Sequence, residues 1–145
     1  MEKSPFKDRI FKEGIASKGA EEFQGTILLV EDEDIILRMG KKILERLGYN
    51  VLTAKNGKDA LDIYGEKKSE IDVLIVDLNM PEMGGLEMYN RMKSLNPDIK
   101  ALISTGHSIC INDSWIEKEG LCGILTKPYR AEEIKTKVNE LIEVN

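Results

Sequence analysis

The chain has 145 residues, of which 41% are hydrophobic and 32% charged, and its formal net charge is -5 at pH 7. This length and composition predict one globular domain with a hydrophobic core of its own. The negative charge argues against nucleic acid as a direct partner, because phosphate binding needs a basic surface. Since no apolar stretch is long enough to span a membrane and no signal peptide is visible, we expect a cytoplasmic protein without direct membrane contact.

Residues 1–24 differ from the rest of the sequence. They mix charges of both signs and show no long periodic pattern. They predict an N-terminal tail or linker that precedes one domain over residues 25–145. A short docking helix is the alternative for this segment, with one apolar face made by Phe6, Ile10, Phe11 and Ile15.

From residue 26 onward, short apolar runs alternate with segments whose apolar residues recur at helical spacing. Gly48 stands where a C-cap glycine belongs, Asn56-Gly57 indicates a turn, and Asn96-Pro97 ends a helix. The expected strands cover residues 26–30, 50–54, 71–76, 99–104 and 121–125, and the expected helices cover 34–47, 58–67, 84–95, 109–119 and 130–144. Such alternation predicts an α/β fold in which helices cover both faces of a parallel sheet.

Four side chains in the last third of the chain are interpreted as structural. We expect Cys110 and Cys122 to be small, partly buried thiols, because two cysteines do not make a disulfide framework. His107 is expected in an exposed loop, and with two separated cysteines it does not readily supply a zinc site. Trp115 is interpreted as a packing residue of its helix.

Four of the apolar runs end in polar groups. The first is followed by Glu31-Asp32, the second by Asp77, the third by Ser104-Thr105 and the fourth by Thr126-Lys127. Open α/β sheets bind ligands outside the carboxyl ends of their strands. These side chains are therefore expected to meet in one place although they are far apart in the sequence.

Glu31, Asp32 and Asp77 would repel one another in a shared cleft, and a divalent cation with oxygen ligands relieves such repulsion. Mg²⁺ typically binds one or two carboxylates together with a phosphate oxygen. The alternative is that these acids only cap helices and line loops, where Asp is common.

Lys127 and Thr105 add a cation and a hydroxyl that can both bind a phosphoryl oxygen. Phosphoryl transfer needs mainly positioning and charge neutralisation, and an Asp carboxylate can act as the nucleophile that forms an aspartyl phosphate. The set of residues therefore suits a transferring phosphoryl group.

Four segments carry a family resemblance: LLVED at 28–32, VDLNMPEMGG at 76–85, STG at 104–106 and LTKPY at 125–129. In order and spacing they look like a response-regulator receiver domain of two-component signalling, of the CheY-like superfamily. The resemblance covers residues 26 to about 143. It implies a flavodoxin-like, doubly wound parallel sheet of five strands in the order 2-1-3-4-5, with five helices on two faces.

The resemblance also implies site roles. Asp77 would accept the phosphoryl group from a phosphohistidine of a partner. Asp77 and Asp32 would bind Mg²⁺ directly, Glu31 would bind it through water, and the backbone carbonyl of Asn79 would be the remaining protein ligand. Lys127 would pair with Asp77 and then with the phosphoryl group.

The same resemblance predicts how phosphorylation would change the surface of the protein. Thr105 would move toward the phosphoryl group, and the Lys127-Pro128 peptide would be cis. Phosphorylation would then switch a protein-interaction surface made by residues 107–119, the last strand and the last helix.

Two departures from the family pattern stand out. Glu31 replaces the first aspartate of the usual acidic pair, which leaves metal binding plausible. Ile124 occupies a position that carries Tyr or Phe in many receivers, and it cannot make the rotamer change of an aromatic ring.

Three other classes of protein share parts of this pattern. A haloacid-dehalogenase-like phosphatase needs a second acid two residues after its nucleophile, where this chain has Asn79. A flavodoxin-like cofactor binder needs a phosphate-cradling loop, but the acids at 31–34 would repel phosphate without metal. A degenerate receiver would act only as a protein-interaction module, and a magnesium titration followed by fluorescence would distinguish it.

The resemblance implies a signalling phosphoacceptor that catalyses only its own phosphorylation and dephosphorylation. Its partners would be a sensor histidine kinase or histidine phosphotransfer protein and a downstream protein target, and a phosphorylation-dependent dimer also fits. A chain from Met1 to Asn145 fits a stand-alone regulator, a phosphorelay receiver or the receiver piece of a hybrid histidine kinase.

Overall fold

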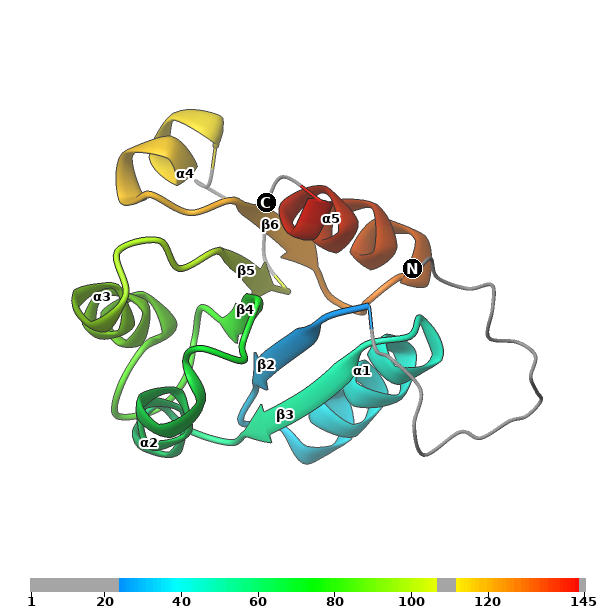
Figure 1. Cartoon of the computed structure of the whole chain (residues 1–145), viewed down its shortest axis with the longest axis horizontal. Helices are drawn as coiled ribbons and strands as arrows, with labels where there is room; N and C mark the ends of the chain where they lie inside the picture. The colour runs from blue at the N-terminus through cyan, green and yellow to red at the C-terminus, as the bar shows by residue number, and fades with distance from the viewer. Residues whose placement is uncertain (1–23, 107–111, 144–145) are drawn as a thin grey trace, which may run out of the picture.

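The computed structural model describes residues 24–106 and 112–143, which form alternating strands and helices (Figure 1). In chain order the elements are β2 (Thr26–Val30), α1 (Asp34–Arg46), β3 (Asn50–Ala54), α2 (Gly57–Lys67), β4 (Val73–Asp77), α3 (Gly85–Leu95), β5 (Ala101–Thr105), α4 (Asp113–Glu119), β6 (Gly123–Thr126) and α5 (Ala131–Glu143). Among these described elements, no helix is both long and apolar enough to cross a lipid bilayer.

The strands form one sheet in the order β3-β2-β4-β5-β6, and every neighbouring pair is parallel. Numbered along the chain this is the order 2-1-3-4-5, so the predicted doubly wound fold is confirmed. In the register of the sheet, Asp77 lies opposite Ser104 and Thr105 lies opposite Thr126. The carboxyl ends of the central strands therefore come together at one edge.

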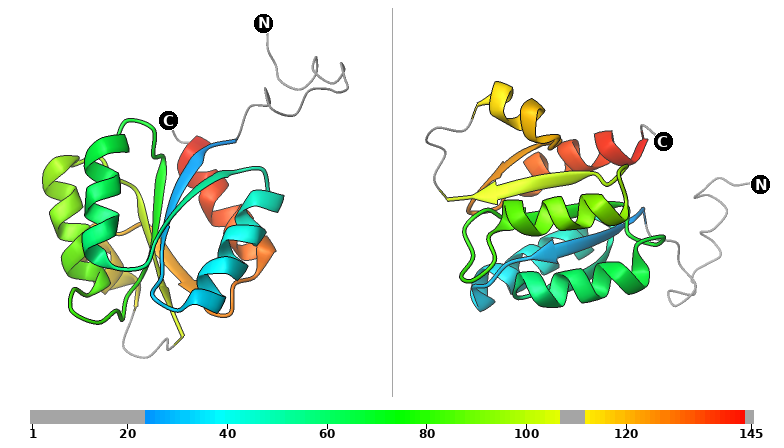
Figure 2. Two further views of the ribbon diagram at one scale, coloured as in Figure 1. Left: turned by 90° about the horizontal axis from the view of Figure 1, so that it is seen from below. Right: turned by 90° about the vertical axis from the view of Figure 1, so that its left-hand side faces the viewer.

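Helices cover both faces of this sheet, α1 and α5 on one side and α2, α3 and α4 on the other (Figures 1 and 2). The inner strand β2 shows why. Ile27 and Leu29 belong to the core under α1 and α5, whereas Leu28 and Val30 belong to the core under the other three helices. A strand buried on both faces is apolar throughout, which is the pattern of a parallel sheet.

Some element boundaries differ from the prediction. Asn56 is not only part of a turn but the N-cap of α2, because its side chain accepts a hydrogen bond from the Asp59 N–H at 2.7 Å. Gly48 has φ +101° just after α1, in the left-handed conformation expected of a helix-ending glycine. The Asp77 and Thr105 side chains belong to the last residues of β4 and β5 instead of following them.

Of the side chains predicted to have only structural roles, Trp115 is confirmed and Cys122 is not. Trp115 is partly buried and packs against the core under α2, α3 and α4, as predicted. Cys122 is exposed, so the prediction of a partly buried thiol is wrong at that position, which directly precedes edge strand β6. The predictions for residues 1–23, His107 and Cys110 lie outside the described residues.

Candidate functional site

Three carboxylates meet at the carboxyl ends of the central strands. Glu31 directly follows β2 and Asp77 ends β4, and these two strands are neighbours in the sheet. With Asp32, they place one carboxylate oxygen each within 4.8 Å of one another. The parallel register thus assembles the acidic group that the strand ends predicted.

Burial sets the electrostatics of this group. Glu31 is 0% exposed and Asp77 only 3% exposed, whereas Asp32 is half-buried. Charged carboxylates are costly in such surroundings unless cations or hydrogen-bond donors compensate them.

Lys127 supplies one compensating charge. Its Nζ lies 3.0 Å from Glu31 Oε1 and 3.3 Å from Asp77 Oδ1, and its side chain is only 14% exposed. The lysine follows β6, its backbone N–H donates to the Thr105 carbonyl at 3.0 Å, and the Lys127-Pro128 peptide is cis as the resemblance implies. Lys127 therefore bridges two carboxylates, and the shorter contact is to Glu31.

The pKa values follow from this geometry. Burial raises the pKa of Glu31 to about 7, the Asp77 charge adds to the rise, and Lys127 opposes it. Burial also raises the pKa of Asp77, whereas the hydrogen bond from the Asn79 N–H and the charge of Lys127 lower it in part. Burial alone would lower the pKa of Lys127, but its hydrogen bond to Glu31 and the charges of both acids outweigh it and raise that pKa.

The donor set fits a hard divalent cation. Three carboxylates lie within 4.8 Å of one another, and Lys127 pairs with only Glu31 and Asp77 among them in the described part of the chain. Burial is the main cause that raises the pKa values of Glu31 and Asp77, so the charged forms of both acids gain from a bound cation. Clustered carboxylate oxygens open to water on the Asp32 side are ligands that Mg²⁺ accepts.

The loop after Asp77 is held tightly. The Asn79 N–H donates to Asp77 Oδ1 at 3.2 Å, and the Met83 N–H donates to the Pro81 carbonyl at 2.7 Å around Glu82, whose φ is +69°. This three-residue turn is of a rare and strained kind. At Gly85 a Cβ atom would lie 2.2 Å from the Asp77 carbonyl oxygen, so the start of α3 rests directly on the backbone of Asp77.

Thr105 and Ile124 belong to the two strands that follow β4 in the sheet, β5 and β6. Thr105 ends β5 and is 1% exposed. Ile124 lies in β6, is half-buried, and its carbonyl accepts a hydrogen bond from Lys137 Nζ of α5 at 2.6 Å. The expected departure at Ile124 is thus accompanied by a side-chain link between β6 and α5.

Sequence reasoning did not predict one side-chain hydrogen bond of this region. The Tyr129 hydroxyl donates to Ser104 Oγ at 3.1 Å, and both side chains are buried. Two signals in the sequence could have indicated this pair: a tyrosine directly after Lys127-Pro128, and a serine beside Thr105 in an otherwise apolar strand.

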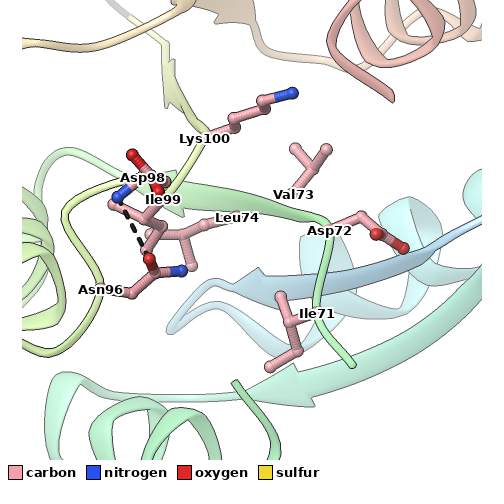
Figure 3. A pocket seen from close by; sticks show the side chains of 8 residues that line it. All are labelled: Ile71, Asp72, Val73, Leu74, Asn96, Asp98, Ile99 and Lys100. Carbon is pink, nitrogen blue, oxygen red and sulfur yellow. Dashed lines mark hydrogen bonds between the residues drawn. The ribbon is translucent and has the colours of Figure 1, made fainter. Parts of the chain in front are cut away.

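A pocket of about 130 Å³ lies at the opposite, amino end of the sheet, where β4 and β5 begin (Figure 3). Two of its three charged groups bind backbone atoms of other elements. Asp72 Oδ2 accepts from the Thr26 N–H at 2.8 Å, and Lys100 Nζ donates to the Leu141 carbonyl at 2.8 Å. These contacts join the start of the sheet to the end of α5, so the pocket is structural.

Comparison with known proteins identifies the family. Residues 27–139 match the family described as the response regulator receiver domain, so the chain belongs to this family of two-component signalling.

Curated relatives place receivers in different contexts. The chain is 34% identical over 118 residues to the sensor kinase CckA of Brucella abortus, covering 81% of this chain but 12% of that kinase. It is 30% identical over 118 residues to the response regulator receiver protein CpdR of the same organism, covering 80% of this chain and 95% of CpdR. It spans 20% of the two-component response regulator ARR10 of Arabidopsis thaliana.

Solved structures show the same fold. A response regulator receiver domain protein from Clostridium thermocellum has 34% identity and a TM-score of 0.77, with 83% of this chain and 95% of that chain covered. The response regulator TrrA of Thermotoga maritima, solved in complex with Mg²⁺ and BeF, has 30% identity and a TM-score of 0.72, with 81% and 98% covered.

Proposed function

We propose that this chain is a phosphoacceptor receiver in which Asp77 takes a phosphoryl group from the phosphohistidine of a partner kinase or phosphotransfer protein. The observation that carries the proposal is the shared lysine: Lys127 Nζ contacts Asp77 at 3.3 Å within a cluster of three carboxylates. A lysine beside a nearly buried aspartate suits the charge that develops on a transferring phosphoryl group.

Each residue of the site would have its own role in the phosphoryl transfer. One Asp77 oxygen forms the new P–O bond while the P–N bond of the phosphohistidine breaks, and Lys127 donates to a phosphoryl oxygen. Asp32, Asp77 and the Asn79 carbonyl would bind Mg²⁺ directly, and Glu31 would bind it through water. When bound, the cation would neutralise charge on the phosphoryl oxygens.

Thr105 and Lys127 would then report the phosphoryl group. Both are tied to the same strand end, because the Lys127 N–H donates to the Thr105 carbonyl at 3.0 Å. New hydrogen bonds to these two side chains would shift the surface of residues 107–119, β6 and α5 between two arrangements. A downstream protein would read that surface, and the chain would act on no other substrate.

The domain boundary belongs to the same proposal. Residues 25–145 would form the receiver, and residues 1–24 a tail or linker. Gln24 already contacts the folded part, because its N–H donates to the Gly48 carbonyl at 2.9 Å.

Replacing Asp77 by Asn tests the phosphoacceptor. We expect Asp77→Asn to abolish Mg²⁺-dependent labelling by radioactive acetyl phosphate, because an amide oxygen is a poor nucleophile. Asp98→Asn, an equal change of charge in the pocket at the other end of the sheet, is the matched control and should label like the wild-type protein. Undiminished labelling of Asp77→Asn would refute the assignment.

A further inference from the structure

Tyr129 and Ser104 form a polar contact inside the apolar core under α1 and α5. The Tyr129 hydroxyl lies 3.1 Å from Ser104 Oγ, and the two residues are 8% and 0% exposed. The surrounding core consists of aliphatic side chains such as Leu29 and Leu125. A phenylalanine and an alanine would fill the same space without burying polar atoms, so packing alone does not require this pair.

The pair connects two parts of the candidate site. Ser104 directly precedes Thr105 and lies opposite Asp77 in the sheet, and its carbonyl accepts from the Leu78 N–H at 3.0 Å. Tyr129 follows Lys127 by two residues. The hydrogen bond therefore ties the end of β5 to the loop that carries the lysine.

The Tyr129–Ser104 hydrogen bond adds to a backbone hydrogen bond between the same two segments. The Lys127 N–H donates to the Thr105 carbonyl, which fixes the first residue of the loop. The Tyr129 hydroxyl fixes the loop again on the far side of Pro128. With both ends of the Lys127–Tyr129 segment bound to β5, rotation of the Lys127 backbone is restricted.

The neighbourhood of Tyr129 leaves its ring little freedom. A Cβ atom at Gly40 of α1 would lie 3.0 Å from Tyr129 Cε2 and 2.9 Å from Leu29 Cδ2. The ring thus fills a space that exists because α1 has a glycine there. Burial, together with the charges of Glu31 and Asp77, raises the pKa of Tyr129, so its hydroxyl stays protonated and remains a donor.

We propose that the Tyr129–Ser104 hydrogen bond positions Lys127 and Thr105 relative to Asp77. Tyr129 and Ser104 are positioning residues, since they act through the lysine and the threonine rather than on the phosphoryl group. The inference rests on the proposed function of Asp77.

The double variant Tyr129→Phe/Ser104→Ala separates positioning from stability. It removes both polar groups at once, and such a matched removal is nearly neutral for folding because no buried group is left unpaired. We expect its melting temperature and Mg²⁺ affinity to stay at wild-type values. The rate of Asp77 labelling at saturating Mg²⁺ should fall roughly tenfold, because a small misplacement of the groups that position a reacting phosphoryl group slows its transfer.

Tyr64→Phe is the matched control. Tyr64 is another fully buried tyrosine with a side-chain hydrogen bond, which its hydroxyl accepts from Asn96 Nδ2 at 2.9 Å. Asn96 lines the pocket at the amino end of the sheet (Figure 3), whereas Asp77 is the last residue of β4, at the carboxyl end. Loss of this bond should leave the labelling rate unchanged, whatever it does to stability.

Three results would decide the matter. Labelling of the double variant at the wild-type rate, with normal labelling of the wild-type protein, would overturn the positioning role and leave the proposed function intact. A wild-type protein that does not label at all would overturn both. If the double variant does not fold, Tyr129→Phe alone should show the slower labelling, and a wild-type rate there would equally refute the inference.

Discussion

At the carboxyl end of the sheet, three carboxylates face one lysine; at the amino end, Asp72 and Lys100 each bind a backbone group of another element. Both ends carry charged side chains, but Asp72 and Lys100 each bind a neutral backbone group, whereas the three carboxylates at the other end lie within 4.8 Å of one another. This difference separates charged residues that stabilise the fold from charged residues of the candidate site. At the amino end, each of these two charged side chains binds one backbone group and so holds two elements together. At the carboxyl end, the clustered carboxylates lie where we propose that a cation and a phosphoryl group bind.

Lysine replacements at the two ends should give the largest contrast. Lys127→Ala leaves Glu31 and Asp77 without their counter-charge, so we expect a loss of about 3 kcal/mol in the free energy of unfolding at pH 8. Some Asp77 labelling should persist, but the phosphorylated variant should not adopt the phosphorylated conformation. Urea unfolding and heteronuclear NMR spectra with and without acetyl phosphate would measure both effects.

Lys100→Ala is the control at the amino end. It removes a hydrogen bond to the Leu141 carbonyl and should cost about 1 kcal/mol without altering labelling or the conformational response. The contrast between the two ends would fail if both lysine variants were equally destabilised, or if Lys127→Ala still responded to phosphorylation.

The pH dependence of stability should come from the carboxyl end. The pKa of Glu31 is raised from 4.5 to about 7 in the folded protein, so the folded state binds more protons than the unfolded state between these values. Without Mg²⁺, this group should make the protein less stable as the pH rises from about 4.5 to about 7. The raised pKa of Asp77 acts in the same direction.

Thermal unfolding at several pH values would test this assignment. Glu31→Gln should flatten the pH dependence, because the amide does not titrate. Saturating Mg²⁺ should also flatten it by replacing bound protons. A slope that survives in Glu31→Gln would place its origin outside that carboxylate.

Asp72→Ala should give a smaller effect than either lysine replacement. It removes the acceptor of the Thr26 N–H, but the contact is exposed, so the expected loss is about 0.5–1 kcal/mol. Asp98→Ala, an exposed residue of the same pocket, should change stability less. Both variants should label normally with acetyl phosphate, and slower labelling of Asp72→Ala would show that the two ends are coupled.

The sequence predicted the order of the elements well because the strands of this sheet are buried on both faces. Three strands nevertheless begin two residues later than predicted, at Val73, Ala101 and Gly123. The apolar residues that misled the prediction, Ile71 and Ile99 among them, are buried without belonging to the strand. Hydrophobicity reports burial, whereas a strand is defined by backbone pairing with its neighbour.

For the candidate site, the sequence predicted which side chains come together but not the contacts between them. Strand-end positions indicated that Glu31, Asp77 and Lys127 would meet. They could not indicate that the lysine would lie closer to Glu31 than to Asp77, because that depends on the length and rotamer of the glutamate side chain. The Tyr129–Ser104 bond depends on two faces of different elements meeting, which no local pattern encodes.

The turn around Glu82 bears on how this chain could be re-engineered. Position 85 accepts no side chain, since any Cβ atom there would collide with the Asp77 carbonyl. Position 82 is exposed, and its φ of +69° suits glycine or asparagine better than glutamate. A library that varies the loop between β4 and α3 to change partner preference should therefore keep residue 85 fixed and vary residue 82, where substitution can relieve strain.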